Sequence, residues 1–438
     1  MIQYRDPPAM LRALRHRNYR LFFTGQSISL IGTWMTNLAA TWLLWRLTQS
    51  AELLGLLGFV AQVPTFVFAP IAGVWVDRLN RHRLLIATQT LAMIQAFAMA
   101  ALALSGTIRI WEIFALQLAL GLVNAFDMPA RQALLVDLIE DRGDLSNAVA
   151  LNSSMVNAAR LIGPSIAGVL IAWVGEGWCF FSDGVSYLAV ITSLLFMQVA
   201  SRPRPAVRQR VLHDLRDGVR YAYHFKPIRS ILLLLALVGL AGMPYRVLMP
   251  VIAGQTLGGG AHTLGFLMAA MGAGALSGAL YLASRRSVLG LGRLIPFSAG
   301  TFGLALTGMG LSRTLWLSLA LMVIMGLGFM VHLAASNTLI QTLVREEMRG
   351  RVMSLYAMAF MGMATFGSAL SGGIAGVIGT PFTLMGGGLL CLLGAGVFWF
   401  KLPGLRDHVR PIYIEKGILP GVAETVRDAT VLREEVER

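Results

Sequence analysis

The sequence predicts an all-α membrane protein in which twelve transmembrane helices form two pseudo-symmetric six-helix bundles. Three observations lead to this fold class: the composition is strongly apolar, the apolar residues come in runs of membrane-spanning length, and the second half of the chain repeats features of the first. Of the 438 residues, 56% are hydrophobic and 13% are charged, whereas a soluble protein has about 25% charged residues. The chain therefore lacks the polar surface that a soluble protein of this length needs.

Twelve apolar runs are long enough to cross a bilayer, since a helix needs about 20 apolar residues to span the hydrocarbon core. Proline interrupts several of them, but in a bundle the neighbouring helices can satisfy the backbone groups that proline frees. The predicted spans are 21–45, 53–76, 84–105, 110–135, 146–174, 178–199, 230–254, 263–283, 293–311, 315–341, 352–378 and 381–400.

The basic residues predict how these spans are oriented. With the N-terminus inside, 31 of the 36 lysines and arginines fall in inner segments, and the outer loops keep three, Arg46, Arg109 and Arg313. Positive charge favours the cytoplasmic side of a membrane. We therefore expect a multi-pass protein of the plasma membrane (the bacterial inner membrane) with both termini in the cytoplasm. This topology accounts for the net charge of +14 without a nucleic-acid partner.

The longest polar interruption, about 200–229, divides six spans from six. Within it, Leu212, Leu215, Val219 and Tyr223 share one face of a helix. This predicts an amphipathic helix, either on the inner leaflet or as a solvated linker. The expected organisation is an N-terminal bundle at 1–200, a cytoplasmic linker at 201–229, a C-terminal bundle at 230–402 and a cytoplasmic tail at 403–438.

The two halves resemble each other at several small residues. The Leu-Gly pair that opens the second span at Gly55 recurs in the eighth span at Gly265, and a shift of 204 residues places Gly168 on Gly372. Weak internal symmetry of this kind is typical of secondary transporters, in which two bundles move around a central site.

The segment GVWVDRLNRHRLL, between the second and third spans, places small and charged residues at a helix end. Gly73 would let two helices approach closely, and Asp77 can accept hydrogen bonds from a neighbouring helix N-terminus or pair with an arginine. The segment resembles motif A of the major facilitator superfamily in Gly73, Asp77, Arg78 and Arg81, with Asn80 where a second glycine is usual.

This resemblance covers nearly all of 15–402 and implies the twelve-helix fold. In that family the cluster latches the two bundles together on the cytoplasmic side when the outside is open, so the same role is expected here. The alternative is an ordinary charged loop that only sets topology.

A second short motif lies in the fifth span, in the segment RLIGPSIAG. Proline kinks a helix, and small residues allow tight packing. Gly163, Pro164 and Gly168 resemble motif C of proton-driven exporters, with Ala167 in place of a glycine. The overall pattern resembles the bacterial branch that contains the enterobactin exporter and macrolide efflux proteins. Gln117 stands where motif B of the superfamily has an arginine, which leaves the proton mechanism open.

Ionisable residues inside spans cost about 2.5–3.5 kcal/mol each at a helix centre, so they usually face the interior and serve a function. Asp127 lies one turn before Arg131, which predicts a local ion pair or a proton-binding carboxyl. A shift of 205 residues places His332 at the position of Asp127, so the two could face one cavity, or each could be a packed structural residue. These three residues are candidates for the cavity or for proton coupling.

Two arginines complete the candidate set. Arg160 lies near the middle of the fifth span and needs a counter-charge, for which Asp127 or Asp183 could serve, or an anionic ligand. Arg246 lies in the seventh span between two prolines, where a broken helix would line a cavity. It could attract an anionic substrate or extend to the outer interface.

We therefore expect a secondary active transporter, a proton-coupled exporter of a small amphiphilic molecule of the drug or siderophore type. A lysophospholipid or metabolite importer and a non-transporting sensor or scaffold remain alternatives. The chain carries no phosphate-binding loop, zinc-ligand spacing or nucleophile elbow, so neither enzyme activity, a metal nor a cofactor is expected. The expected partners are the substrate, protons and the bilayer, with no oligomer required.

Overall fold

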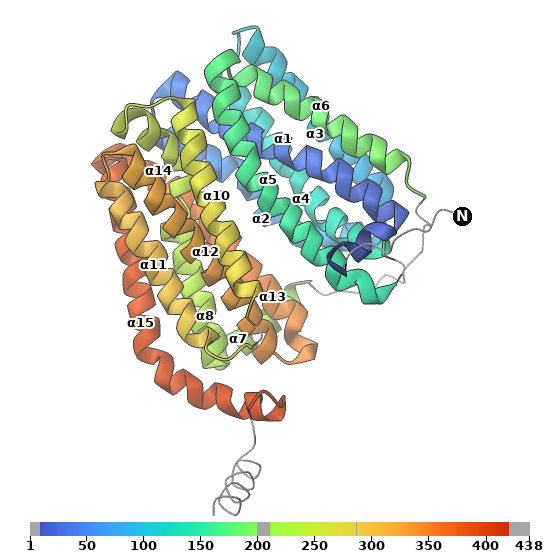
Figure 1. Cartoon of the computed structure of the whole chain (residues 1–438), viewed down its shortest axis with the longest axis vertical. Helices are drawn as coiled ribbons and strands as arrows, with labels where there is room; N and C mark the ends of the chain where they lie inside the picture. The colour runs from blue at the N-terminus through green and yellow to red at the C-terminus, as the bar shows by residue number, and fades with distance from the viewer. Residues whose placement is uncertain (1–8, 140, 199–210, 286, 420–438) are drawn as a thin grey trace, which may run out of the picture.

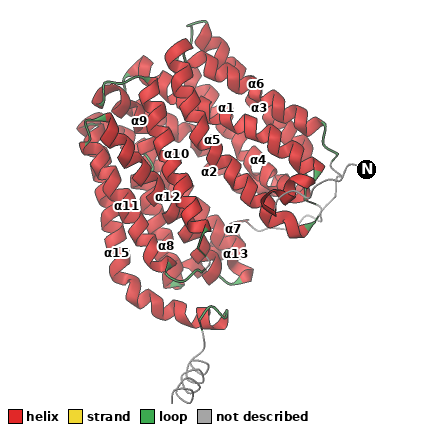
Figure 2. Cartoon of the chain, in the orientation of Figure 1, coloured by secondary structure: helices red, strands yellow, loops and turns green. Residues whose placement is uncertain are grey.

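The computed structural model describes residues 9–139, 141–198, 211–285 and 287–419, and these contain helices and no strand (Figure 2). Eleven of the described helices or unbroken helical runs are long and apolar enough to cross a membrane. The remaining long helix, α1 (Arg17–Thr48), has 32 residues and more polar positions, and it packs among the others. The all-α membrane fold with twelve long helical segments is confirmed.

The first half of the chain forms six long helices that pack together (Figure 1). α1 contacts α5 and α6, α3 contacts α4 and α6, and α2 contacts α4. Ser50 and Asn80 begin α2 and α3 by accepting hydrogen bonds from the amides of Leu53 and Arg83, as N-cap residues do. The elements are η1 (Ala9–Arg15), α1, α2 (Ala51–Arg78), α3 (Arg81–Leu104), α4 (Ile110–Asp137), η2 (Arg142–Asp144), α5 (Leu145–Val174) and α6 (Glu176–Leu195).

The second half forms another group of packed helices, in which α12 contacts α10 and α11, and α15 contacts α8 and α11. We call the helices of the first half the first set and those of the second half the second set. Its elements are α7 (Val211–His224), α8 (Lys226–Leu237), η3 (Val238–Gly242), α9 (Tyr245–Val251), η4 (Ile252–Thr256), α10 (Ala261–Ala283), α11 (Leu291–Leu311), α12 (Leu315–Leu343), η5 (Glu346–Met348), α13 (Arg349–Ala357), η6 (Met358–Gly362), α14 (Met363–Ile378) and α15 (Thr380–Glu415).

The seventh span is broken, as its prolines predict. The π-helical η3 follows α8, and a turn at Met243 and Pro244 separates it from α9. Pro250 lies inside α9, which continues into a second π-helical segment, η4. The eleventh span also contains a π-helical turn, η6, between α13 and α14. Widened turns of this kind are frequent at functional sites.

The linker helix is present as α7, which packs against α8 and α13. The side chain of Val219 is 50% exposed and that of Tyr223 is 64% exposed. The predicted boundary between the last bundle and the tail, at 402, does not coincide with the end of a helix. α15 continues through Pro403 and Pro411 to Glu415 and bends near its lower end (Figure 1). A proline inside a helix removes a single backbone hydrogen bond, so it can kink a helix without ending it.

The two sets meet closely at one end, which we call the sealed end and define by the glycines Gly55, Gly168, Gly265 and Gly372. A Cβ at Gly372 would lie 2.6 Å from the Cα of Gly55, and a Cβ at Gly265 would lie 2.8 Å from the Cα of Gly168. These contacts join α2 to α14 and α5 to α10. Since only glycine allows backbones to approach this closely, the glycines that the repeat aligned are where the sets touch.

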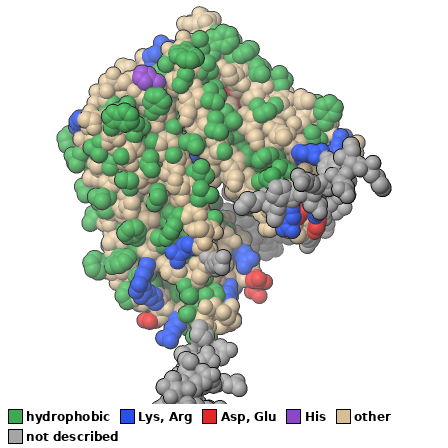
Figure 3. All heavy atoms as spheres, in the orientation of Figure 1, with side chains coloured by type: hydrophobic (Ala, Val, Ile, Leu, Met, Phe, Trp, Pro, Cys, Tyr) green, Lys and Arg blue, Asp and Glu red, His purple; other side chains and the backbone are tan. Residues whose placement is uncertain are grey.

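The opposite end, which we call the linker end, carries η1, η2, α7, α13 and the tail of α15. The two sets diverge towards it (Figure 1), and the space-filling view shows a notch between them (Figure 3). Leu161 against Gly272 and Phe66 against Gly362 are contacts between the sets nearer the middle of the molecule. The structure is therefore closed at the sealed end and opens towards the linker end.

Candidate functional site

One aromatic ring in the middle of the molecule is contacted by two arginines from different halves. The guanidinium carbon of Arg160 lies 5.2 Å from the ring centroid of Trp34, and that of Arg246 lies 5.1 Å from the same centroid. Trp34 belongs to α1, Arg160 to α5 and Arg246 to α9. The geometry is that of two cation–π interactions, and it spans the boundary between the two sets.

The motif in the fifth span positions this cluster. A Cβ at Gly163 would lie 2.5 Å from the Cβ of Trp34, so glycine is needed for α5 to lie against α1 at the tryptophan. One turn further, Gly168 and the carbonyl of Pro164 contact Gly265 of the other set. The close packing expected of Gly163, Pro164 and Gly168 is present, and it places Arg160 beside both α1 and the boundary between the sets.

The expected carboxylate partners of Arg160 are not there. Within the described residues, no carboxylate lies at ion-pair distance from Arg160 or Arg246, and the Nε atom of Arg160 is buried without a hydrogen-bond partner. All three side chains of the cluster are partly exposed. The interpretation of Arg160 as a structural pair with Asp127 or Asp183 is therefore wrong, and the alternative of an anionic ligand remains.

Asp127 instead forms the predicted local pair with Arg131. Its other oxygen accepts hydrogen bonds from Thr88 at 2.8 Å and from Gln89 at 2.7 Å, both on α3. The carboxylate is 2% exposed. Because its oxygens are occupied by an arginine and two neutral donors, Asp127 is a satisfied structural anion inside the first set.

His332 is also packed within its own set. It is 1% exposed, its Nδ1 atom lies 3.4 Å from the carbonyl oxygen of Ile295 on α11, and its Nε2 atom has no described partner. His332 and Asp127 do occupy equivalent places, α12 against α11 and α4 against α3. Their contacts are with neighbours in the same set, so the idea of a shared cavity gains no support.

Asp183, which the sequence offers as a possible counter-charge for Arg160, is a buried carboxyl. It is 1% exposed in α6, and a Cβ at Gly32 of α1 would lie 2.6 Å from its Oδ1 atom. Its neighbours are hydroxyls: the Ser186 hydroxyl lies 3.4 Å from Oδ1, and Thr36 lies beside it. Within the described residues no basic side chain pairs with it.

The loop between α2 and α3 is described in part. The backbone of Gly73, Asp77 and Arg78 continues α2, but the side chains of Asp77 and Arg78 lie outside what the structure describes. The side chain of Arg81, at the start of α3, donates to Asp137 at the end of α4 with an N–O distance of 2.8 Å. This ion pair holds α3 to α4 within the first set.

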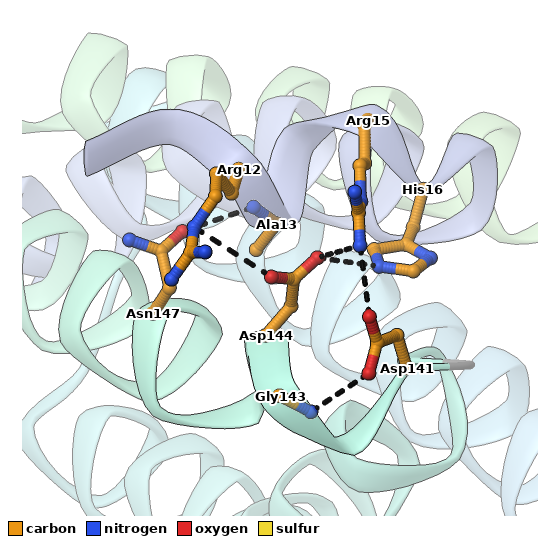
Figure 4. Close-up of polar contacts among 8 residues, drawn as sticks. All are labelled: Arg12, Ala13, Arg15, His16, Asp141, Gly143, Asp144 and Asn147. Carbon is orange, nitrogen blue, oxygen red and sulfur yellow. Dashed lines mark hydrogen bonds and ion pairs between the residues drawn. The ribbon is translucent and has the colours of Figure 1, made fainter. Parts of the chain in front are cut away.

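A polar clamp at the linker end, defined by Arg12, Arg15, His16 and Asp144, fixes η1 to the start of α5 (Figure 4). Asp144 is 2% exposed; its oxygens lie 2.9 Å from Arg15 Nη2, 3.1 Å from His16 Nε2 and 3.8 Å from Arg12 Nε. The amide of Ala13 donates to Asn147 on α5 at 2.9 Å. The sequence reasoning treated these arginines as topogenic charges and missed their partner.

The second set has an equivalent contact with the charges exchanged. Arg351, at the start of α13, donates to Asp217 of α7 at 3.3 Å, and its backbone lies against Gly218. The shift of 204 residues places Asn147 on Arg351. In both halves, the segment before the first span of that half is therefore held to the start of its fifth span: η1 is held to α5, and α7 is held to α13.

A family model described as "Transmembrane secretion effector" matches residues 9–412. The chain belongs to this family of the major facilitator superfamily. It is a multi-pass membrane transporter and not an enzyme, and the resemblance that motif A suggested is confirmed.

Curated relatives match over most of both chains. A staphyloferrin A transporter of Staphylococcus aureus is 28% identical, with 87% of this chain and 95% of the relative covered. A macrolide efflux protein A of Streptococcus pyogenes is 23% identical, with 86% and 96% covered. The enterobactin exporter EntS of Shigella boydii is 27% identical, with 84% and 87% covered.

Solved structures agree with the fold. A mutant of the nucleoside transporter NupG superposes with a TM-score of 0.69 at 12% sequence identity and covers 88% of this chain and 99% of its own. A bacterial homologue of the human lysosomal transporter Spinster has a TM-score of 0.68 at 13% identity, with 90% and 98% covered. At these identities the likeness concerns the fold alone.

Proposed function

We propose that this transporter is a proton-coupled exporter that moves a small amphiphilic molecule across the bacterial plasma membrane by alternating access. The observation that carries the proposal is the position of Trp34 between Arg160 and Arg246, because these side chains come from both halves and lie at their boundary. A substrate held there would contact both halves at once, as alternating access requires. Relatives named for enterobactin export and macrolide efflux support the outward direction.

We propose for the domains the division that the sequence predicts, with an N-terminal bundle at 1–200, a C-terminal bundle at 230–402 and α7 in the linker between them. The helix α15 continues from the second bundle to Glu415. Most of the basic residues in the described part of the chain lie in or beside the elements of the linker end, which supports a cytoplasmic location for that end and for both termini. The conformation with a sealed outer end and an open cytoplasmic notch is then the one that loads substrate from the cytoplasm.

Asp183 is the proton-binding residue in this proposal. It is buried among hydroxyl groups without a basic partner in the described residues, whereas Asp127 pairs with Arg131. A carboxyl that lacks a counter-ion can be neutral in one conformation and ionised in another. Gly73, Asp77, Arg78 and Arg81 form the proposed cytoplasmic gate, which would hold the linker ends together when the outer end opens.

Inverted membrane vesicles test the proposal. With an acidic interior, vesicles that contain the protein should accumulate an anionic amphiphilic dye such as carboxyfluorescein or one of a panel of antibiotics. Asp183→Asn should abolish proton-driven accumulation but retain exchange of labelled for unlabelled substrate. Asp141→Asn, an exposed acid at the linker end, is the matched control and should behave as wild type. Absence of accumulation for the whole panel would refute export, and full activity of Asp183→Asn would refute its role.

A further inference from the structure

The Trp34 cluster, which consists of Trp34, Arg160 and Arg246, carries two positive charges that no described carboxylate balances. Arg160 and Arg246 both lie within about 5 Å of one ring, so their guanidinium carbons are at most about 10 Å apart. No carboxylate in the described part of the chain pairs with either. The two cations also repel each other across the boundary between the halves.

The surrounding groups do not remove this imbalance. The acids inside the described spans near the cluster are used elsewhere: Asp127 pairs with Arg131, and Asp183 faces Ser186 and Thr36. The Nε atom of Arg160 is buried without a hydrogen-bond partner. A buried donor on a charged group that has no acceptor in the protein is the feature that a ligand acceptor would complete.

We infer that the Trp34 cluster binds an organic dianion, a small molecule with two acidic groups about 10 Å apart or less on an apolar body. Each acidic group accepts planar, charge-assisted hydrogen bonds from one guanidinium, and the apolar body lies against the indole of Trp34. The inference rests on the proposed transport function and names the substrate class of that same site.

The dianion also has a consequence for movement of the two halves. Arg160 belongs to the first set and Arg246 to the second, so in the absence of an anion their repulsion opposes closure of the notch. One molecule that neutralises both arginines replaces this repulsion with a bridge. Anion binding therefore favours the conformation in which the notch is closed, and a molecule with two acidic groups does so more strongly than one with a single acidic group.

The test measures binding to the purified full-length protein by equilibrium dialysis with naphthalene-2,6-dicarboxylate, which is fluorescent, and with its neutral dimethyl ester. We expect the dicarboxylate to bind wild type, and Arg160→Gln and Arg246→Gln each to weaken binding about tenfold or more. Arg293→Gln, an exposed arginine at the start of α11, is the matched control and should bind as wild type. Arg160→Lys keeps the charge and should bind more tightly than Arg160→Gln.

Three outcomes would overturn the inference: equal affinity for the ester, an undiminished affinity in both glutamine variants, or arginine-dependent binding of lysophosphatidylglycerol without binding of the dicarboxylate. The last outcome would mean that the site accepts a singly charged lipid headgroup. Dye uptake into inverted vesicles is measured in parallel. Loss of all uptake with intact, arginine-dependent dicarboxylate binding refutes export alone, and normal uptake with arginine-independent binding refutes the dianion alone.

Discussion

Replacing Gly372 by alanine should loosen the sealed end. The new Cβ would lie 2.6 Å from the Cα of Gly55 and 2.9 Å from the carbonyl oxygen of Ala51. Both atoms belong to the backbone of α2, which cannot turn aside as the end of a flexible side chain can. Carbon atoms in contact lie about 3.5–4.0 Å apart, so α2 and α14 must separate by about 1 Å to accept the methyl group.

The size of the effect follows from the cost of overpacking. An extra methyl group in a tight contact costs about 1–3 kcal/mol. Only conformations in which this end is closed carry the cost, because the two glycines separate when the end opens. The ratio of open to closed forms at this end should therefore rise about 5- to 150-fold.

Spin labels on loops at the sealed end can measure this ratio by double electron–electron resonance. Thr107, between α3 and α4, and Thr314, before α12, are exposed positions on the two halves, and each is replaced by cysteine and labelled. The native Cys179 and Cys391 are both 0% exposed, so they should not take up label. In Gly372→Ala, a longer distance should gain population relative to the parent.

Gly373 provides the matched control, because it is the next residue in the same helix and nothing lies within 4 Å of its Cβ position. Gly373→Ala should give the distance distribution of the parent protein. The reasoning would be refuted by identical distributions for Gly372→Ala and the parent. It would also be refuted if Gly373→Ala produced the same shift, since that would reflect helix composition and not the contact with Gly55.

Three further predictions concern the polar contacts. Asp144→Asn should lower the free energy of unfolding by about 1–2 kcal/mol, since the buried carboxylate joins η1 to α5. Asp141→Asn is the control, because this acid is 59% exposed, and it should lower the free energy of unfolding by less than about 0.5 kcal/mol. Equal thermal midpoints for the two variants would contradict this prediction. Asp217→Arg and Arg351→Asp should each lower the thermal midpoint, and the double exchange should recover part of the loss. Asp127→Asn should destabilise the protein by about 1–3 kcal/mol because Arg131 loses its partner, yet vesicle uptake normalised to folded protein should persist; loss of uptake in a stable variant would restore Asp127 as a transport residue.

Much of the fold was readable from the sequence because the spans are long apolar runs. The second span was predicted at 53–76 and is found as α2 (Ala51–Arg78), and the tenth was predicted at 315–341 and is found as α12 (Leu315–Leu343). The π-helical turns were not predictable in position, because a widened turn depends on packing against neighbours and leaves no fixed residue pattern. The last helix continues past the predicted end of its span at residue 400, since Pro403 and Pro411 lie inside α15 without ending it.

Individual candidates such as Arg160 and Arg246 could be named from the sequence, but most of their contacts could not. The pair of Asp127 and Arg131 could be predicted because an i,i+4 spacing places both side chains on one face of a single helix. The partners Thr88 and Gln89 lie on another helix, and the rotation of two apolar helices about their axes cannot be read from either alone. For the same reason, the sequence left open whether Arg160 pairs with a carboxylate or meets an anionic ligand.

The repeat explains which features could be seen in advance. Gly55 and Gly265 are equivalent positions, as are Gly168 and Gly372, and each close contact joins one member of the first pair to one of the second. Both halves therefore keep the same glycines for the same reason. The charged residues do not follow the repeat: the shift of 204 residues places Arg160 on Ala364 and Asp183 on Gly387. A symmetric scaffold thus carries an asymmetric set of charges, and it is the charges that would determine which molecule and which ion this chain moves.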